Sequence, residues 1–321
     1  MKKIIDIHPE FCYELVCTVP YAYYLHEKNM LEKIVTCHGM SPFYYFCDAV
    51  EEKYTDRTLD NTDNGVQNLP NGWLHHNAPA VFGKGFGELT KEEQSQAVGV
   101  LDYSEWKIPP YKEHFKTTKY NFDKPVIVIC NQWLPSERGG NPLTRYFDFI
   151  CLANMFRYFT SNGYCVVYKR PKNDEFVQDE NESQISMIPP IGVGFKARID
   201  GHVVDDRELT KEFKDVFLFD DLIKDTGYNQ AQLEIFAEAD GFVSVSGGNG
   251  ILCSYFQKPT IMYATVSKET NPSYWQPKGY YQKISNQNAI PVIDLHSDIR
   301  ARGAHDYSLL YETIENTFKK V

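Results

Sequence analysis

The chain has 321 residues, of which 42% are hydrophobic and 24% charged, and its formal net charge at pH 7 is −10. This is the composition of a globular protein long enough for two domains, which excludes intrinsic disorder as the default. Nucleic acids and anionic membrane surfaces are normally bound by clustered Lys and Arg, so the acidic balance argues against both as partners.

Eight cysteines are spread along the chain without a C-x-x-C pair, and most lie within apolar runs. This usage is typical of reduced, buried thiols and indicates a cytoplasmic protein. Charged residues interrupt the first twenty positions, among them Asp6, Glu10 and Glu14. We therefore expect neither a signal peptide nor a membrane span.

The first half opens with apolar runs that predict alternating strands and helices, in the order 4–7, 11–28, 33–37 and a helix that begins after Ser41-Pro42. Residues 55–122 are less periodic and rich in Asn, Asp, Gly and Pro, so we expect loops and short elements there. These observations place a first α/β domain at residues 1–122.

The second half alternates more regularly. Its predicted strands are 125–130, 164–168, 216–219, 242–245, 260–263 and 290–295. Its predicted helices are 143–161, 229–239, 251–256 and 307–320. Such alternation predicts a parallel sheet with right-handed crossovers. We place a second α/β domain at 123–304, with an irregular insertion at 172–206, and expect the helical segment 305–321 to pack back on the first domain.

A glycine-rich loop, Ser246-Gly-Gly-Asn-Gly250, separates a predicted strand from a predicted helix. Glycines at such a junction let the backbone approach a ligand, and the first N–H groups of the helix point toward it. The loop has neither the G-x-x-x-x-G-K-[ST] pattern of a P-loop nor the G-x-G-x-x-G spacing of a dinucleotide site. A phosphate or diphosphate is its natural occupant, although glycines also serve simple turns between strand and helix.

Polar residues follow several of the predicted strands, where parallel sheets bind their ligands. Lys169 and Arg170 follow one strand directly and suit charge-assisted hydrogen bonds to a diphosphate, although such a pair can also be a solvated edge. The anion-binding residues predicted from these loops are Asn131, Arg138, Lys169, Arg170, Asp220, Ser246, Gly247, Gly248 and Asn249.

Three stretches resemble a known family, namely K-P-V-I-V-I-C-N-Q at 124–132, V-V-Y-K-R-P at 166–171 and the run from N-Q-A-Q to V-S-G-G-N at 229–249. They are similar to the nucleotide-sugar-binding half of GT-B glycosyltransferases, in particular fucosyltransferase-like and capsule or viral glycan-building members. The resemblance covers residues 124–295, and residues 1–50 in outline. It implies two Rossmann-like domains that face a cleft, with the donor on the second domain and the acceptor on the first.

The resemblance implies metal-independent transfer of a hexosyl or fucosyl group from a GDP- or UDP-linked donor to a glycan or other hydroxyl acceptor. No permanently bound cofactor is expected, and no D-x-D follows an apolar strand. We expect inverting chemistry in which a base takes the acceptor proton as the nucleotide diphosphate leaves. The candidate bases are His8, Glu14, His38 and Glu137, of which His8 is preferred.

Two other functions are left open by the sequence. A sugar-nucleotide epimerase or phosphorylase can share the architecture and the diphosphate site. A non-catalytic nucleotide- or glycan-binding protein would use the 22 Tyr and 20 Phe residues as stacking platforms for sugars. The oligomeric state is not indicated by any sequence feature.

Overall fold

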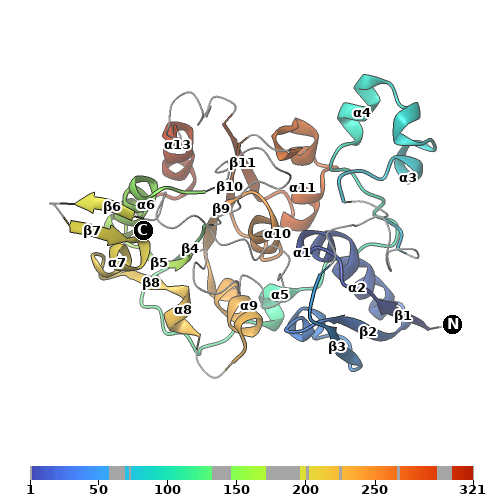
Figure 1. The fold of residues 1–321 in the computed structure, drawn as a ribbon, viewed down its shortest axis with the longest axis horizontal. Coiled ribbons are helices and arrows are strands. Elements are labelled where there is room, and N and C mark those ends of the chain that lie inside the picture. Colours follow the sequence, from blue (N-terminus) through green and yellow to red (C-terminus); the bar gives the residue numbers. More distant parts are fainter. Residues whose placement is uncertain are drawn as a thin grey trace.

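A computed structural model describes residues 2–57, 69–71, 74–131, 146–170, 196–199, 202–223, 226–265, 268–294 and 306–320. Two parallel sheets organise this part of the chain, a small one near the N-terminus and a large one in the second half (Figure 1). Within the described residues, no helix is both long and apolar enough to span a bilayer. The mixed α/β fold with parallel sheets confirms the predicted fold class.

The small sheet has the order β1-β2-β3, and its strands span Lys3–Asp6, Leu31–Cys37 and Val50–Tyr54. Both pairings are parallel. The predicted first helix is built from α1 (Phe11–Tyr13), a π-helical turn (Glu14–Thr18) and α2 (Val19–Glu27), with Pro20 in the first turn of α2, where a missing N–H costs little. A 3₁₀ helix over Ser41–Tyr44 follows β2, where a helix start was predicted.

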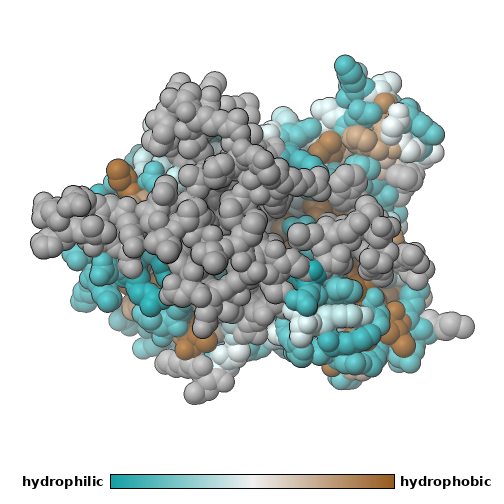
Figure 2. Space-filling model, in the orientation of Figure 1, coloured by the Kyte–Doolittle hydropathy of each residue, from teal (hydrophilic) through white to brown (hydrophobic). Residues whose placement is uncertain are grey.

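The middle of the chain forms short elements, as its composition predicted. They are α3 (Ala78–Phe82), a 3₁₀ turn (Phe86–Glu88), α4 (Lys91–Ala97) and α5 (Tyr111–His114). Thr90 caps α4 by accepting a hydrogen bond from the Glu93 amide, and Glu93 reciprocates through its side chain. In the view of Figure 2, hydrophobic residues form small separate areas among hydrophilic ones, and several of them gather over α3 and α4.

The large sheet contains six parallel strands in the order β11-β10-β9-β4-β5-β8. They are β4 (Val126–Cys130), β5 (Cys165–Lys169), β8 (Val216–Leu218), β9 (Gly241–Val245), β10 (Thr260–Ala264) and β11 (Ala289–Ile293). Counted along the chain, this is the 3-2-1-4-5-6 order of a doubly wound Rossmann fold. The order reverses between β4 and β9, so ligands are expected beyond the carboxyl ends of these two strands.

Helices cover both faces of the large sheet. They are α6 (Phe149–Ser161), α7 (Asp206–Lys211), α8 (Phe219–Leu222), α9 (Tyr228–Glu238), α10 (Gly248–Ser254), α11 (Tyr280–Ser285) and α13 (Ser308–Thr317). A hairpin of β6 (Lys196–Ile199) and β7 (His202–Asp205) lies within the predicted insertion. On one face of the large sheet, the strands pack against α6 and α13 and form one hydrophobic core. A second core lies on the other face and also includes residues of the small sheet.

The final helix packs differently from the prediction. We expected residues 305–321 to return to the first domain, but α13 lies beside β10, β11 and α6 of the large sheet (Figure 1). Tyr158 of α6 donates a hydrogen bond to the Phe318 carbonyl oxygen (2.6 Å), and Phe318 fills the space beside Gly241. The apolar face of α13, including Leu310 and Ile314, therefore belongs to the core of the second half.

Candidate functional site

A buried ammonium group lies at the carboxyl end of β5, one strand from the point where the strand order reverses. The Lys169 side chain donates hydrogen bonds to Gln232 Oε1 and to Asn249 Oδ1 (2.6 Å), and its Nζ lies 5.5 Å from the centroid of the Tyr228 ring. Lys169 is only 2% exposed. None of the described residues places a carboxylate within ion-pair distance of it. Because burying a charge without a counter-ion is costly, this geometry favours a bound anion.

Unpartnered polar atoms belong to the residues that contact this ammonium and to residues three positions away from them in the chain. Among the described residues, Gln232 Nε2, Asn249 Nδ2, Ser246 Oγ and Asn229 Oδ1 are buried without a hydrogen-bond partner. A lysine can only donate, so its bonds turn the amide oxygens of Gln232 and Asn249 toward it and their NH₂ groups elsewhere. Most buried polar groups in proteins have partners. These atoms are explained if a ligand supplies the missing partners, with the amide NH₂ groups and the Ser246 hydroxyl as donors to an anion.

The structure brings together two of the predicted anion-binding residues, Lys169 and Asn249, and places a third, Ser246, three positions before Asn249 in the same glycine loop. It also adds two residues that were missed. Asn229 and Gln232 lie one turn apart on α9, so they share a face of that helix. Both are buried, at 1% and 0% exposure. Two polar residues spaced i, i+3 on an otherwise apolar helix face are the sequence signal that could have revealed them.

The glycine loop is shaped by packing as well as by its turn. Gly247 has φ 123° and ψ −160°, a conformation that only glycine adopts readily. A Cβ added at Gly248 would lie 3.1 Å from Phe11 Cδ1 and 3.3 Å from Cys12 Sγ. The sequence analysis explained the glycines of this loop by the close approach of a ligand to the backbone. In the structure, the close contact of α10 with α1 gives a second reason, because a larger residue would have to displace the side chains of Phe11 and Cys12.

Arg170 is engaged within the protein. Its guanidinium forms a two-pronged ion pair with Asp206, with Nη2–Oδ1 at 2.6 Å and Nε–Oδ2 at 3.1 Å. Asp206 also accepts a hydrogen bond from Tyr168 (2.9 Å), and Arg170 and Asp206 are both buried. The sequence analysis left open whether Arg170 contacts a diphosphate or belongs to a solvated edge. The structure excludes the solvated edge, because Arg170 is buried and its charge is compensated by the carboxylate of Asp206.

Two other predicted ligands have structural partners. Asn131 Nδ2 donates to the Phe147 carbonyl oxygen (3.0 Å), and its Oδ1 accepts from the Phe147 amide (2.8 Å), which fixes the chain before α6. Asp220 lies on α8 beside the edge strand β8, with its Oδ2 3.9 Å from Arg207 Nη2. Glu137 and Arg138 lie outside the described residues.

The candidate bases of the first half differ in their surroundings. Glu14 is completely buried, and its carboxylate accepts hydrogen bonds from Thr36 (2.7 Å), Tyr44 (2.7 Å) and Arg57 (2.5 Å). The sequence placed Glu14 among the candidate bases, but in the structure its carboxylate is enclosed in a buried ion pair with Arg57. His8 follows β1 and stacks on Tyr54, with ring centroids 4.1 Å apart.

His38, the remaining candidate base, follows β2. Its Nδ1 lies 3.8 Å from Glu52 Oε2, and its side chain is 55% exposed. Unlike the buried Glu14, the His38 side chain is therefore more than half exposed, at the carboxyl end of β2.

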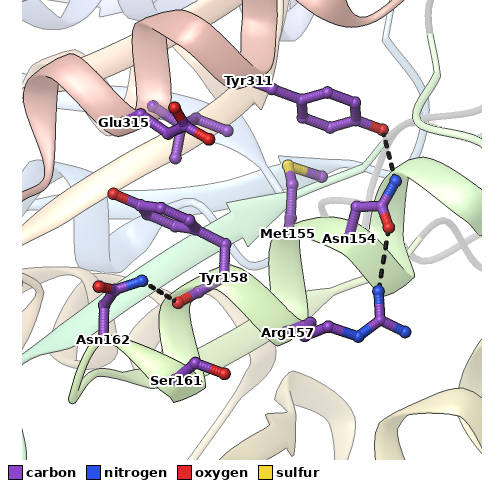
Figure 3. A pocket seen from close by; sticks show the side chains of 9 residues that line it. Asn154, Met155, Arg157, Tyr158, Ser161, Asn162, Tyr311 and Glu315 are labelled. Carbon is purple, nitrogen blue, oxygen red and sulfur yellow. Dashed lines mark hydrogen bonds between the residues drawn. The ribbon is translucent and has the colours of Figure 1, made fainter.

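Two surface cavities lie away from these strand ends. One, of about 400 Å³, lies between α6 and α13, and Figure 3 shows Tyr158 and Tyr311 reaching across the space between the two helices. Another, of about 490 Å³, is lined by Lys124, Val126 and Asp240 at the amino ends of β4 and β9, among other residues. Neither includes a residue of the cluster around Lys169. Within the described ranges, no cluster of three or more His, Cys, Asp or Glu is arranged to hold a metal ion.

No protein-family model matches the chain, and a search of curated proteins gave no match. Solved structures that resemble it include the E. coli ADP-heptose LPS heptosyltransferase II, with 11% identity, a TM-score of 0.49 and coverage of 93% of this chain and 92% of that one. A glycosyl transferase family 9 protein from Veillonella parvula has 10% identity and a TM-score of 0.43, over 94% and 88% of the two chains. S. aureus MnaA with UDP has 13% identity and a TM-score of 0.37, over 90% and 91%. All three TM-scores are below 0.5, so function is inferred below from the residues of this chain.

Proposed function

We propose that the protein is a glycosyltransferase that takes a sugar from a nucleotide-diphosphate donor and transfers it to a glycan or other hydroxyl acceptor. The observation that carries this proposal is the buried Lys169 ammonium, which has only neutral oxygens as hydrogen-bond partners among the described residues. It lies beside the carboxyl ends of the central strands of a doubly wound sheet, where nucleotides bind in this fold class. The diphosphate of the donor supplies the missing negative charge.

The reaction that suits this site is direct displacement at the anomeric carbon, with inversion. Negative charge develops on the leaving diphosphate as its bond to the sugar breaks. A positive charge fixed before the reaction stabilises that change most, because no solvent has to reorganise around it. Lys169, Gln232, Asn249 and Ser246 supply this environment in the proposal. The resemblance seen in the sequence favours a GDP- or UDP-linked hexose or fucose as the donor.

A base completes the reaction, and we propose that it comes from the first half of the chain. His8 and His38 both follow strands of the small sheet, on the side where parallel strands end. Among the described residues, His8 has no hydrogen-bond or ion-pair partner, so its ring nitrogens are open to a substrate. Glu137 remains a proposal from the sequence alone.

Replacing Lys169 by Met tests the anion site. Removal of a charge-assisted contact should weaken GDP or UDP binding by about 1.5–3 kcal/mol. Calorimetry with both nucleotides measures this affinity, and circular dichroism confirms that the variant is folded. Lys124→Met is the matched control, because Lys124 is paired with Asp215 (2.7 Å) at the amino end of β4 and should not affect affinity. Equal affinity of wild type and Lys169→Met would contradict the proposal.

Product analysis separates transfer from the other functions that the sequence left open. The wild type is incubated with each GDP- or UDP-sugar that binds and with a panel of hydroxyl acceptors. A glycosylated acceptor supports the proposal. An epimerised nucleotide sugar would identify an epimerase, a sugar phosphate formed with inorganic phosphate would identify a phosphorylase, and binding without turnover would identify a binding protein.

A further inference from the structure

The first turn of α9 lies against the buried ammonium of Lys169. The centroid of the Tyr228 ring is 5.5 Å from Lys169 Nζ, and Gln232 accepts a hydrogen bond from the same ammonium. Asn229 comes directly after Tyr228 and three positions before Gln232, so it shares a face of α9 with Gln232. Asn229 is only 1% exposed. A second buried amide therefore lies within one helical turn of the proposed diphosphate site.

A contact with the first half of the chain fixes the orientation of this amide. Asn229 Nδ2 donates a hydrogen bond to the carbonyl oxygen of Gly39 (2.9 Å), in the loop that follows β2. Exchange of the amide oxygen and nitrogen would set two oxygens against each other at that distance, and both can only accept. Asn229 Oδ1 is therefore turned away from Gly39. It is buried and has no hydrogen-bond partner among the described residues.

The unpartnered atoms of Asn229, Gln232 and Asn249 differ in chemical character. Gln232 Nε2 and Asn249 Nδ2 are donors, and together with the Lys169 ammonium they suit an anion. Asn229 Oδ1 is an acceptor, which an anion would repel. A buried acceptor needs a donor, because burial without a hydrogen bond costs free energy. A diphosphate alone leaves this oxygen unsatisfied, so the ligand that completes the site carries a hydrogen-bond donor close to its anionic group.

We propose that Asn229 is a specificity-determining residue that accepts a hydrogen bond from a hydroxyl group of the nucleotide-sugar donor. This inference rests on the proposed function and names a part of the substrate other than the diphosphate. Side chains three positions apart on a helix have Cβ atoms about 5–6 Å apart, so the hydroxyl lies within a few bonds of a phosphate. The ribose and the transferred sugar both carry such hydroxyls, whereas the N–H groups of the base lie beyond the ribose.

Ligands that lack single hydroxyls test this contact in the wild type and separate the two sources. Calorimetry compares GDP and UDP with their 2′-deoxy and 3′-deoxy forms. If the ribose supplies the hydroxyl, one deoxy form should bind roughly 2- to 10-fold more weakly, because the buried acceptor is left unpaired. If the transferred sugar supplies it, the deoxy nucleotides should bind normally. A nucleotide sugar that lacks one sugar hydroxyl should then lose the same factor.

Replacing Asn229 by Leu shows whether its oxygen makes this contact. Leu has a similar shape and no polar atom, so Asn229→Leu should bind the ligand with the hydroxyl as weakly as the deoxy ligand, and should no longer distinguish the two. The variant also loses the hydrogen bond to Gly39, so circular dichroism checks its fold. Asn229→Ala is measured in parallel, because it removes the amide without adding apolar atoms beside Gly39.

Gln230→Leu is the matched control. Gln230 follows Asn229 on the same helix, and its side chain donates a hydrogen bond to Glu234 Oε1 (2.8 Å). Its replacement should change neither the affinity nor the preference for the hydroxyl.

Three results would count against the inference. A wild type that binds GDP or UDP but distinguishes none of the deoxy ligands would overturn it, and so would Asn229 variants that keep the preference of the wild type. In both cases Lys169→Met would still weaken nucleotide binding, and the proposed function would stand. A wild type that binds neither nucleotide would overturn the proposed function and the role of Asn229 together.

Discussion

Two buried charged residues of this chain, Glu14 and Lys169, have opposite kinds of surroundings. Glu14 is completely buried, and its charge is balanced by Arg57 and by two hydroxyl donors. Lys169 is buried almost as deeply, yet the oxygens that contact it belong to neutral amides. The first arrangement is complete without a ligand, so it belongs to the fold. The second is incomplete among the described residues, and this difference singles out Lys169 from the other buried charges.

Ser246 offers a test in which stability and binding move in different directions. Its buried hydroxyl has no partner among the described residues, so Ser246→Ala breaks no internal hydrogen bond and should leave the free energy of unfolding unchanged or higher. If the hydroxyl contacts the donor, nucleotide binding should weaken by about 0.5–1.5 kcal/mol. Urea unfolding without ligand and calorimetry with GDP and UDP measure the two quantities.

Ser244 is the matched control for this experiment. It lies two positions earlier, on β9, is equally buried, and donates a hydrogen bond to the Val245 carbonyl oxygen (2.8 Å). Ser244→Ala should therefore lower stability and leave nucleotide affinity unchanged. A Ser246→Ala protein with the affinity of the wild type would remove Ser246 from the site.

At the scale of single residues, the sequence could predict where a residue lies in the fold better than which residue it pairs with. Lys169, Ser246 and Asn249 were found because they follow strands, and strand ends of a parallel sheet lie together. Arg170 follows the same strand as Lys169, but its partner Asp206 lies 36 positions further along the chain. Nothing in the local pattern indicates that pairing. The spacing of Asn229 and Gln232 is present in the sequence, but only the folded structure shows that Asn229 Oδ1 and Gln232 Nε2 are buried without a partner among the described residues.

Arg170 and Asp206 join two elements, the end of β5 and the start of α7. Removal of one partner from such a buried pair leaves an uncompensated charge, so Arg170→Ala should lower the free energy of unfolding by about 3–5 kcal/mol. Urea denaturation measures this loss. Arg170→Lys keeps the charge but loses the planar, two-pronged contact and should recover only part of the stability. Weaker nucleotide binding with unchanged stability would instead restore Arg170 as a ligand.

Among the elements, the strands of the large sheet were the most predictable. Their continuous apolar runs are buried on both faces, and this pattern has few alternatives at such lengths. The strand β3 was missed because Val50–Tyr54 contains three charged residues and alternates exposed with partly buried positions at the edge of the small sheet. That omission also hid Glu52, whose Oε2 lies 3.8 Å from His38 Nδ1.

For the molecule as a whole, the two halves are joined by one hydrophobic core. Residues from α1, α2 and β2 belong to the same buried cluster as residues from β4, β9 and α10. Tyr111 stacks on Tyr255 with ring centroids 5.0 Å apart, and the Tyr255 hydroxyl donates a hydrogen bond to the Leu15 carbonyl oxygen. Apolar periodicity in the sequence indicated which faces are buried, but could not show that two sheets share one core, because contacts between distant segments leave no local pattern.

A shared core predicts that the chain unfolds as one cooperative unit, although the sequence suggested separate domains at 1–122 and 123–304. Urea unfolding followed by far-UV circular dichroism and by tryptophan fluorescence should give coincident transitions. A fragment of residues 1–122 should lack a cooperative transition, because Phe11 and Leu15 would lose the surface of α10 that they contact in the whole chain. Two separated transitions, or a fragment that unfolds cooperatively, would show that the predicted boundary divides two independently stable domains.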